Sequence, residues 1–448
     1  MKAFSALFSP LRFFLMVCFA TMATAVSAQC KLAPMTTGSV FALPEMDSVT
    51  ASVKFTNYGS TPVTDFDYTL YYMDTQETTA QQHVTLDTPL EDGETTSISI
   101  KLRSGKTLGS SDVVLNVAQV NGGYNATSVP YTYITLHTVS VMPRKRVLVE
   151  DYTGMWCGNC PRGIVIMEHL RRIFPDSFVG IAIHCGDALD PRPYGYDNME
   201  RTWAPGKPSV WCGRRNKLYN FDSTTDFLTE LNVMPVANIE VEAKWNVDST
   251  DIAIHTLLTP CIGTTDDNTY SLAYALIENG MKNSNWTQTN YFDLWENNTL
   301  ELPEMEKFRN SGMDVSGLTY DHVVHASLGI SSGIEGSVPK KLEPNHEVEH
   351  DAAFTKIRDL AHIQCRDSLM VCAILLNTTT GKVENVAQCA IVSSTATGIH
   401  ALPTLPTPIT STPEEHFSID GRRISASTPG FHLVRQKDGK VVKVWRGK

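Results

Sequence analysis

The sequence predicts a multidomain, mostly β protein in which two β-sandwiches, the first of them immunoglobulin-like, flank one α/β domain and are followed by a short β tail. Three observations support this. Apolar and polar residues alternate before residue 141 and again after residue 237, a CxxC pair lies between a strand and a helix in the middle of the chain, and 448 residues exceed one ordinary core. The expected segments are a signal peptide 1–28, a first sandwich 29–141, the α/β domain 142–236, a second sandwich 237–393, a linker 394–415 and a tail 416–448.

The N-terminus has the pattern of a secretory signal peptide. Basic residues precede the apolar run 13–23, and Val26 to Ala28 supply small residues at the cleavage position, so the mature chain is expected to start at Gln29. A lipid anchor on Cys30 is an alternative, although Gln29 stands where lipoprotein processing requires a small residue. No other segment approaches the roughly 18 apolar residues of a spanning helix. We therefore expect an exported protein.

Residues 31–140 have the pattern of short strands joined by turns. Alternation at 52–56 is followed by a turn at 57–60, and it recurs at 66–72 and 96–102. This spacing is typical of an immunoglobulin-like sandwich, a fold that by itself implies spacing or adhesion. The net charge of -11 provides no basic stripe for phosphate groups, so we expect no nucleic-acid partner.

The strongest chemical signal lies between residues 146 and 174. Residues 146–150 are predicted to form a buried strand and 163–174 an amphipathic helix, with Cys157 and Cys160 between them near the helix start. This order is the local architecture of a thioredoxin-type redox centre, and it makes 142–236 a predicted thioredoxin-like domain. Helix N-terminal N–H groups and the helix dipole favour a thiolate, so Cys157 is the expected nucleophile and Cys160 the resolving thiol.

The same two cysteines allow other interpretations. A zinc knuckle would need a second CxxC or a pair of histidines at ligand spacing, which the sequence does not contain, so we expect no metal and no cofactor. A structural disulfide, or a thioredoxin-like fold that has lost its activity, would use Cys157 and Cys160 without turnover. The alternative to a possible thiol-disulfide oxidoreductase is therefore a non-enzymatic binding or adhesion protein.

The expected thioredoxin-like fold adds two residues to the predicted site. The buried strand 178–185 ends near His184, and the carboxyl ends of strands line the site of an open α/β sheet, so His184 could tune the thiolate. A histidine that is simply satisfied at the strand end is the simpler interpretation. Thioredoxin-like folds also need a cis-proline opposite the disulfide, for which Pro208 is the first choice and Pro235 the second.

One structural disulfide can be argued among the other cysteines. Strands at 369–376 and 383–393 flank a turn signal centred on Thr380-Gly381, which would place Cys372 opposite Cys389. Residues opposite each other in such a pair have Cα atoms about 4.5–5.5 Å apart, within the range of a disulfide. We predict this bridge, with two buried free thiols as the alternative.

Four motifs occur within residues 142–393. The first two are Thr153 to Arg162, which contains the CxxC pair, and the strand 179–185, which ends near a histidine. The other two are Gly206 to Ser209, followed by Arg215, and Tyr320 to Val324. Together they resemble the outer membrane protein 28 family of Bacteroidetes. The resemblance implies a thioredoxin-like domain followed by a β-sandwich in an envelope protein, and the family offers no firmly assigned reaction. Lys207 departs from the aromatic residue often seen before that proline, and the first sandwich is additional.

The end of the chain carries a second resemblance. Residues 393–415 are rich in Pro, Ser and Thr and are expected to be a linker, and short strands joined by turns follow from 417. This tail resembles the last part of type IX secretion sorting domains, which implies delivery to the outer membrane or cell surface, with the periplasm as the alternative. The expected partners are exported or envelope proteins that carry thiols or disulfides.

Overall fold

The computed structural model describes residues 30–36, 38–190, 195–219, 221, 223–264, 269–293, 302–360, 362–393 and, in the tail, 415–417, 423–424, 430–435 and 441–446. The chain divides into two compact units, residues 1–395 and 396–448. The predicted signal peptide and nearly all of the predicted linker lie outside the described residues. Among the helices that are described, none is long and apolar enough to cross a membrane.

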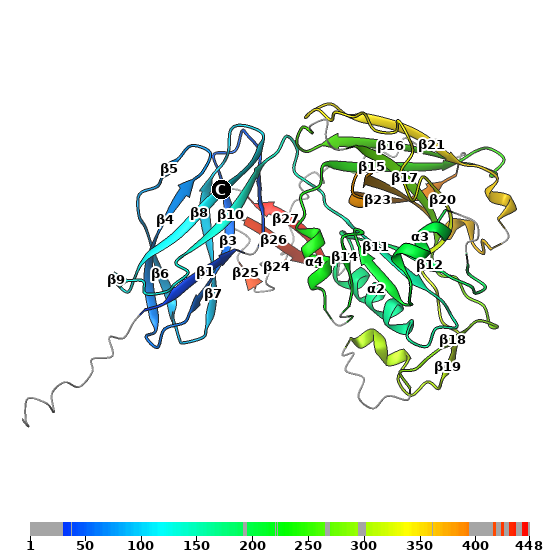
Figure 1. Cartoon of the computed structure of the whole chain (residues 1–448), viewed down its shortest axis with the longest axis horizontal. Coiled ribbons are helices and arrows are strands. Elements are labelled where there is room, and N and C mark those ends of the chain that lie inside the picture. Colours follow the sequence, from blue (N-terminus) through cyan, green and yellow to red (C-terminus); the bar gives the residue numbers. More distant parts are fainter. Residues whose placement is uncertain are drawn as a thin grey trace, which may run out of the picture. The chain divides into compact units, whose positions relative to one another are not determined.

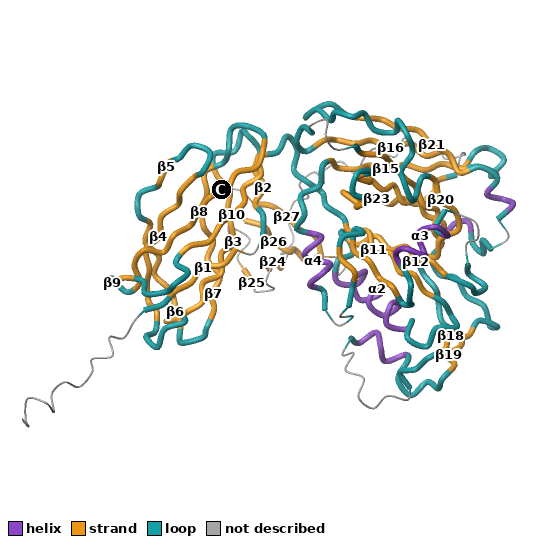
Figure 2. The backbone as a smooth tube through the Cα atoms, viewed as in Figure 1, coloured by secondary structure: helices purple, strands orange, loops and turns teal. Residues whose placement is uncertain are grey.

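The N-terminal part forms the predicted sandwich of two sheets (Figures 1 and 2). One sheet has the order β1 (Leu32–Thr36), β3 (Ser48–Asn57), β7 (Thr95–Arg103). The other has the order β2 (Val40–Ala42), β10 (Tyr131–Thr138), β8 (Gly109–Val120), β4 (Val63–Tyr72), β5 (Glu77–Thr78), with β6 (Gln82–Leu90) on β4 and β9 (Gly123–Tyr124) on β8. Alternate residues of both sheets enter one core, where Phe55 of β3 meets Phe66 of β4 with ring centroids 4.6 Å apart.

The central part has the predicted thioredoxin-like order of elements. The strands β11 (Val147–Thr153) and β12 (Phe178–His184) are parallel and are joined by helix α2 (Pro161–Ile173). Strand β13 (Ser209–Cys212) pairs antiparallel with β11, and it is followed by β14 (Asn216–Lys217) and helix α4 (Thr225–Leu231), while helix α3 (Asp197–Trp203) precedes it. Every residue of β11 and β12 is buried, and β12 is accordingly an apolar run without alternation, whereas β11 also buries Glu150, Asp151 and Thr153.

The strands after residue 237 continue the same sheet. Strand β20 (Val323–Leu328) pairs in parallel with β12, and the order then runs β17 (Tyr270–Glu278), β22 (Leu369–Asn377), β23 (Lys382–Val392), β15 (Ala237–Trp245), β16 (Ile252–Pro260), β21 (Val348–Phe354). Residues of β15 and β16 share a core with β17 and β22, so the two halves of this sheet pack face to face as the second sandwich (Figure 1). Strand β23 joins the halves because it pairs with both β22 and β15.

The predicted bridge between Cys372 and Cys389 is wrong. Both are free thiols, and Cys372 lies opposite Gln388. The hairpin turns earlier than the sequence suggested, with Asn377 opposite Lys382, and a bulge then shifts the register. A shift of one residue moves a side chain to the other face of a strand. Cys372 therefore faces the core shared with β12, whereas Cys389 packs against the core of the second sandwich.

Two further parts complete the fold. A segment that follows β17 carries the short strands β18 (Thr287–Thr289) and β19 (Asp314–Ser316), which pair with each other, and the 3-10 helix η1 (Pro303–Lys307). Two more 3-10 helices, η2 (Ile357–Asp359) and η3 (Arg366–Ser368), precede β22. In the second unit, four strands form the predicted β tail in the order β25 (Arg423–Ile424), β24 (Glu415–Phe417), β26 (Gly430–Arg435), β27 (Val441–Arg446).

Candidate functional site

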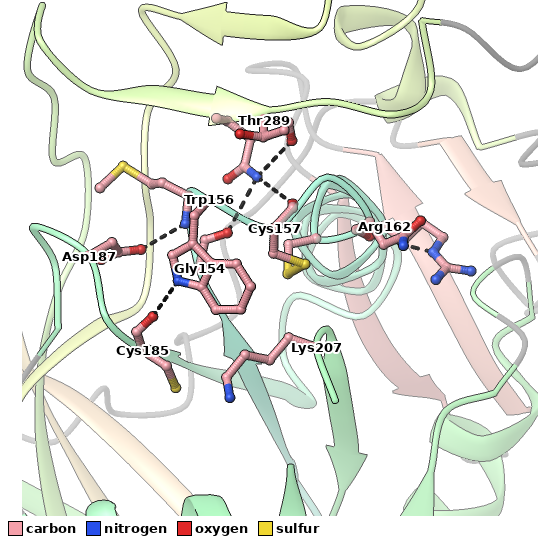
Figure 3. The surroundings of a disulfide bond; sticks show 12 residues. Gly154, Trp156, Cys157, Arg162, Cys185, Asp187, Lys207 and Thr289 are labelled. Carbon is pink, nitrogen blue, oxygen red and sulfur yellow. Dashed lines mark hydrogen bonds between the residues drawn. A yellow bond between two sulfur atoms is a disulfide. The ribbon is translucent and has the colours of Figure 1, made fainter. Parts of the chain in front are cut away.

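The predicted CxxC pair forms a disulfide at the start of α2 (Figure 3). The Cα atoms of Cys157 and Cys160 are 5.3 Å apart, and Cys160 is the N-cap residue with Pro161 in the first helical turn. Pro is tolerated there because the first N–H groups of a helix have no partner within it. Both residues are buried, but Cys157 is 7% exposed and Cys160 is 0% exposed, so Cys157 is the more accessible of the two. An outer and an inner cysteine are what attack followed by resolution requires.

The residue chosen as the cis-proline has that geometry. The Lys207–Pro208 peptide bond is cis, and Pro208 directly precedes β13, whose first residue Ser209 pairs with Tyr152 of β11. In the view of Figure 3, Lys207 and Thr289 lie on opposite sides of the disulfide. Pro235 has no cis bond. A part of Pro208 in binding a substrate backbone stays a prediction.

His184 is linked to the turn before Cys157 through Asp187. Its Nδ1 lies 2.8 Å from Oδ2 of Asp187, and the same carboxylate oxygen accepts the N–H of Met155 at 2.7 Å. Burial alone would raise the pKa of Asp187, but the hydrogen bond from His184 helps to outweigh it, and the pKa is lowered. This is the strand-end histidine of the simpler interpretation. It fixes the turn before Cys157, and an effect on the thiolate stays a prediction.

Asp151 belongs to the site, and the sequence interpretation missed it. This residue of β11 is 1% exposed, and a Cβ atom on Gly163 of α2 would overlap its carboxylate, so the carboxylate lies against the first turns of the helix that Cys160 caps. Its Oδ1 has no hydrogen-bond partner among the described residues. Burial raises the pKa of Asp151 to about 8. A carboxylate in a wholly buried strand, six residues before Cys157, is the signal that could have identified it.

A small cavity adjoins this carboxylate. Its volume is about 30 Å³, and its lining includes Asp151, His184, Tyr320 and His322. The Tyr320 hydroxyl and His322 Nδ1, like Asp151 Oδ1, have no partner among the described residues. A buried water needs roughly 10–15 Å³ and two to four polar partners. Burial lowers the pKa of His322 to about 4, so this ring is neutral at pH 7. The cavity is therefore large enough to hold water beside Asp151.

A segment that is distant in the sequence covers one side of residues 154–160, which we call the CxxC turn. We call Thr287 to Tyr291 the strap. The N–H of Thr289 donates to the carbonyl of Met155 at 2.8 Å, and the N–H of Tyr291 donates to the carbonyl of Gly158 at 3.0 Å. A Cβ atom on Gly158 would overlap the Tyr291 ring, so glycine is required for this close approach. Nothing in the local sequence pairs segments about 130 residues apart.

The remaining cysteines do not extend the site. Cys185 is buried, its pKa is raised mainly by burial, and its carbonyl accepts the indole N–H of Trp156 at 2.7 Å. Cys365 is the exposed one among the described free cysteines. The part of the chain that the structure describes brings together no group of three or more His, Cys, Asp or Glu side chains that could hold a metal ion.

The fold and the site define a multidomain, mostly β protein with a thioredoxin-like CxxC centre. Among solved structures, the chain is similar to HBP35 of Porphyromonas gingivalis, with 16% identity, a TM-score of 0.39, and coverage of 68% of this chain and 99% of that chain. It is also similar to a structural-genomics protein of Agrobacterium tumefaciens, with 12% identity, a TM-score of 0.31, and coverage of 56% and 96%. No family model and no curated protein matches the sequence. The functional argument therefore rests on the site itself.

Proposed function

We propose that the protein is an exported thiol-disulfide exchange protein of the cell envelope. The observation that carries the proposal is the disulfide at the start of α2, in which Cys157 is 7% exposed and Cys160 is fully buried. In the reduced protein, the helix N-terminus favours the Cys157 thiolate over the thiol. The exposed Trp156, at 56%, provides an apolar surface next to this sulfur for a substrate chain.

The exchange proceeds in two displacements. The Cys157 thiolate attacks a substrate disulfide, forming a bond to one substrate sulfur and releasing the other as a thiolate. The Cys160 thiolate then attacks the Cys157 sulfur, forming the intramolecular disulfide and releasing the second substrate thiolate. The substrate gains two electrons and the CxxC pair loses two. In the reverse direction the same steps oxidise a substrate dithiol.

Asp151 fits the role of proton acceptor for the second displacement. Cys160 is fully buried, so its thiol needs a nearby base before it can attack. A pKa of about 8 places Asp151 close to neutral pH, where a group exchanges protons most effectively. The adjoining cavity, whose lining includes Asp151 and His322, is large enough to hold water that could carry the proton away.

Export is supported by the N-terminal sequence pattern. The proposed partners are exported or envelope proteins with thiols or disulfides. The proposed location is the outer membrane or the cell surface, supported by the two resemblances in the sequence, with the periplasm as the alternative.

Mixed-disulfide trapping tests the proposal. Reduced Cys160→Ser protein, carrying also Cys365→Ser to remove the exposed thiol, is incubated with oxidised glutathione. We expect one glutathione to stay bound at Cys157, because the resolving thiol is missing, whereas the variant with both CxxC cysteines intact releases it. Intact mass spectrometry measures the adduct. The same variant then identifies partners in envelope extracts.

The matched control is Cys157→Ser in the same Cys365→Ser background. It should carry no adduct, because Cys160 is buried. Equal adduct on both variants, or none on either, would show that Cys157 is not a reactive nucleophile. The CxxC pair would then be a structural clip in a binding or adhesion protein.

A further inference from the structure

The buried side chain of Gln288 is bound to the CxxC turn. It is 0% exposed, and its amide Nε2 donates to the carbonyls of Cys157 at 3.0 Å, Thr289 at 3.0 Å and Gly154 at 3.4 Å. Three carbonyl partners settle which end of the amide is nitrogen, since only the NH₂ end can donate. Figure 3 shows these three bonds as dashed lines that end on the labelled residues Thr289, Cys157 and Gly154. The strap and the turn are thus joined through one side chain as well as through the backbone.

The strap is a fixed element. The side chain of Asn290 is fully buried, and its amide donates to the carbonyls of Phe308 at 2.7 Å and Gly312 at 3.0 Å. The backbone N–H of Asn290 donates to the carbonyl of Met313 at 2.6 Å. The pairing of β18 with β19 adds ladder bonds on the same side. Gln288 therefore holds the turn against a support that is itself bonded to the fold.

These bonds orient the peptide groups around the sulfur of Cys157. The strap donates to the carbonyls of Met155, Cys157 and Gly158, so these three carbonyls point toward it. In a trans peptide the C=O and the following N–H point in opposite directions. The N–H groups that follow, those of Trp156, Gly158 and Asn159, therefore point away from the strap. In Figure 3 the Cys157 sulfur also lies on the side away from Thr289, where these donors would meet a thiolate.

The other end of the Gln288 amide argues against a purely structural role. Its Oε1 is buried and has no hydrogen-bond partner among the described residues. A buried acceptor without a partner is unfavourable, and a native structure that keeps one calls for an explanation. Leucine or methionine has a similar volume and would fill the same space without that acceptor. What only glutamine supplies here is the NH₂ group on the carbonyls of the turn.

We propose that Gln288 is a positioning residue for Cys157, which holds the turn so that backbone N–H groups stabilise the Cys157 thiolate. This rests on the proposed function and adds a residue from outside the thioredoxin-like segment to its site. Thiolate stabilisation favours the reduced form of a CxxC pair. Gln288 therefore raises the reduction potential of the CxxC pair, which makes the pair a stronger oxidant. Through the strap, a segment outside the thioredoxin-like domain influences the chemistry of Cys157.

The test is Gln288→Leu in the mature protein, with Gln388→Leu as the matched control. Gln388 of β23 also has a buried Oε1 without a partner among the described residues, and it lies outside the strap and the CxxC turn. For Gln288→Leu we expect a raised Cys157 pKa, measured by thiolate absorbance, and an equilibrium with glutathione moved about tenfold toward the disulfide. That change is about 30 mV more negative in reduction potential. Gln388→Leu should leave both quantities unchanged.

A second variant separates positioning from folding. Gln288→Met keeps an unbranched side chain and should give the same shift, with the circular dichroism spectrum of the wild type. Folded variants with an unchanged potential and an unchanged Cys157 pKa would overturn the proposal, as would an equal shift in Gln388→Leu. Thiolate absorbance reports the Cys157 pKa without any exchange reaction, so this readout for Gln288 is independent of whether Cys157 exchanges with glutathione in the trapping experiment.

Discussion

Replacing Asp151 with asparagine is expected to slow the resolution of a mixed disulfide on Cys157 by about 10²- to 10⁴-fold, the usual contribution of a positioned general base. The reason is geometric. Asp151 lies against the first turns of the helix that Cys160 caps, and no ion partner competes for its charge among the described residues. Asparagine keeps the shape and removes the base. Rapid mixing of reduced protein with a chromogenic disulfide separates this step from the attack by Cys157, whose rate should stay close to that of the wild type.

The same substitution should change the pH dependence of stability. The folded pKa of Asp151 is raised from 3.8 to about 8 by burial, so its contribution to stability is complete below pH 4 and is lost as pH rises through 8. Between these limits one proton is bound only in the folded state, which corresponds to a slope of about 1.4 kcal/mol per pH unit. Asparagine does not titrate and should remove that slope.

Denaturant unfolding of both proteins from pH 5 to pH 8 measures the difference. The stability of Asp151→Asn relative to the wild type should increase steadily across this range. Parallel pH profiles, together with equal resolution rates, would contradict the assignment of Asp151 as the buried base.

Replacing Arg214 with methionine is expected to lower the free energy of unfolding by about 3–5 kcal/mol. Its guanidinium donates to both carboxylate oxygens of Glu150 at 2.7 Å, and also to the carbonyl of Ile330 at 2.8 Å. Both side chains of the pair are at most 2% exposed. Burial alone would lower the pKa of Arg214, but Glu150 outweighs it and raises the pKa. Methionine would leave the Glu150 charge buried without its partner.

Two comparisons identify the cause. Arg103→Met removes an exposed pair with Glu77, whose N–O distance is also 2.7 Å, and should lower the free energy of unfolding far less. Combining Glu150→Leu with Arg214→Met removes both charges and should recover part of the loss. Equal losses for the Arg214 and Arg103 variants would contradict a role for burial.

Much of the fold could be predicted from local patterns. Alternation at β3 and β4 reports one buried face, and the apolar run of β12 reports burial on both. The CxxC pair is placed by the strand before it and the helix after it. The choice of Pro208 followed from the same fold, because a thioredoxin-like site places a cis-proline at the start of the next strand, and the bond is cis.

The rest depends on contacts between distant residues. The position of Cys389 depended on a turn and a bulge that change the register by one residue, which no local pattern reports. Strand β20 joins β12 although about 140 residues separate them. In the sequence, Asp151 is one more polar residue in a strand. Its burial against Gly163 and beside the cavity appears only in the folded structure. The strap could not be predicted either, because it contacts residues about 130 positions earlier in the chain.

The central claim is that the CxxC pair turns over, and the reduction potential of the mature protein tests it most directly. Equilibration with glutathione buffers, with alkylation and mass analysis of the peptide that carries Cys157 and Cys160, gives the potential. The account predicts a value between about -270 and -120 mV, the range of exchange proteins, with a Cys157 pKa below about 7.5. A value below about -300 mV, typical of structural disulfides, would contradict it.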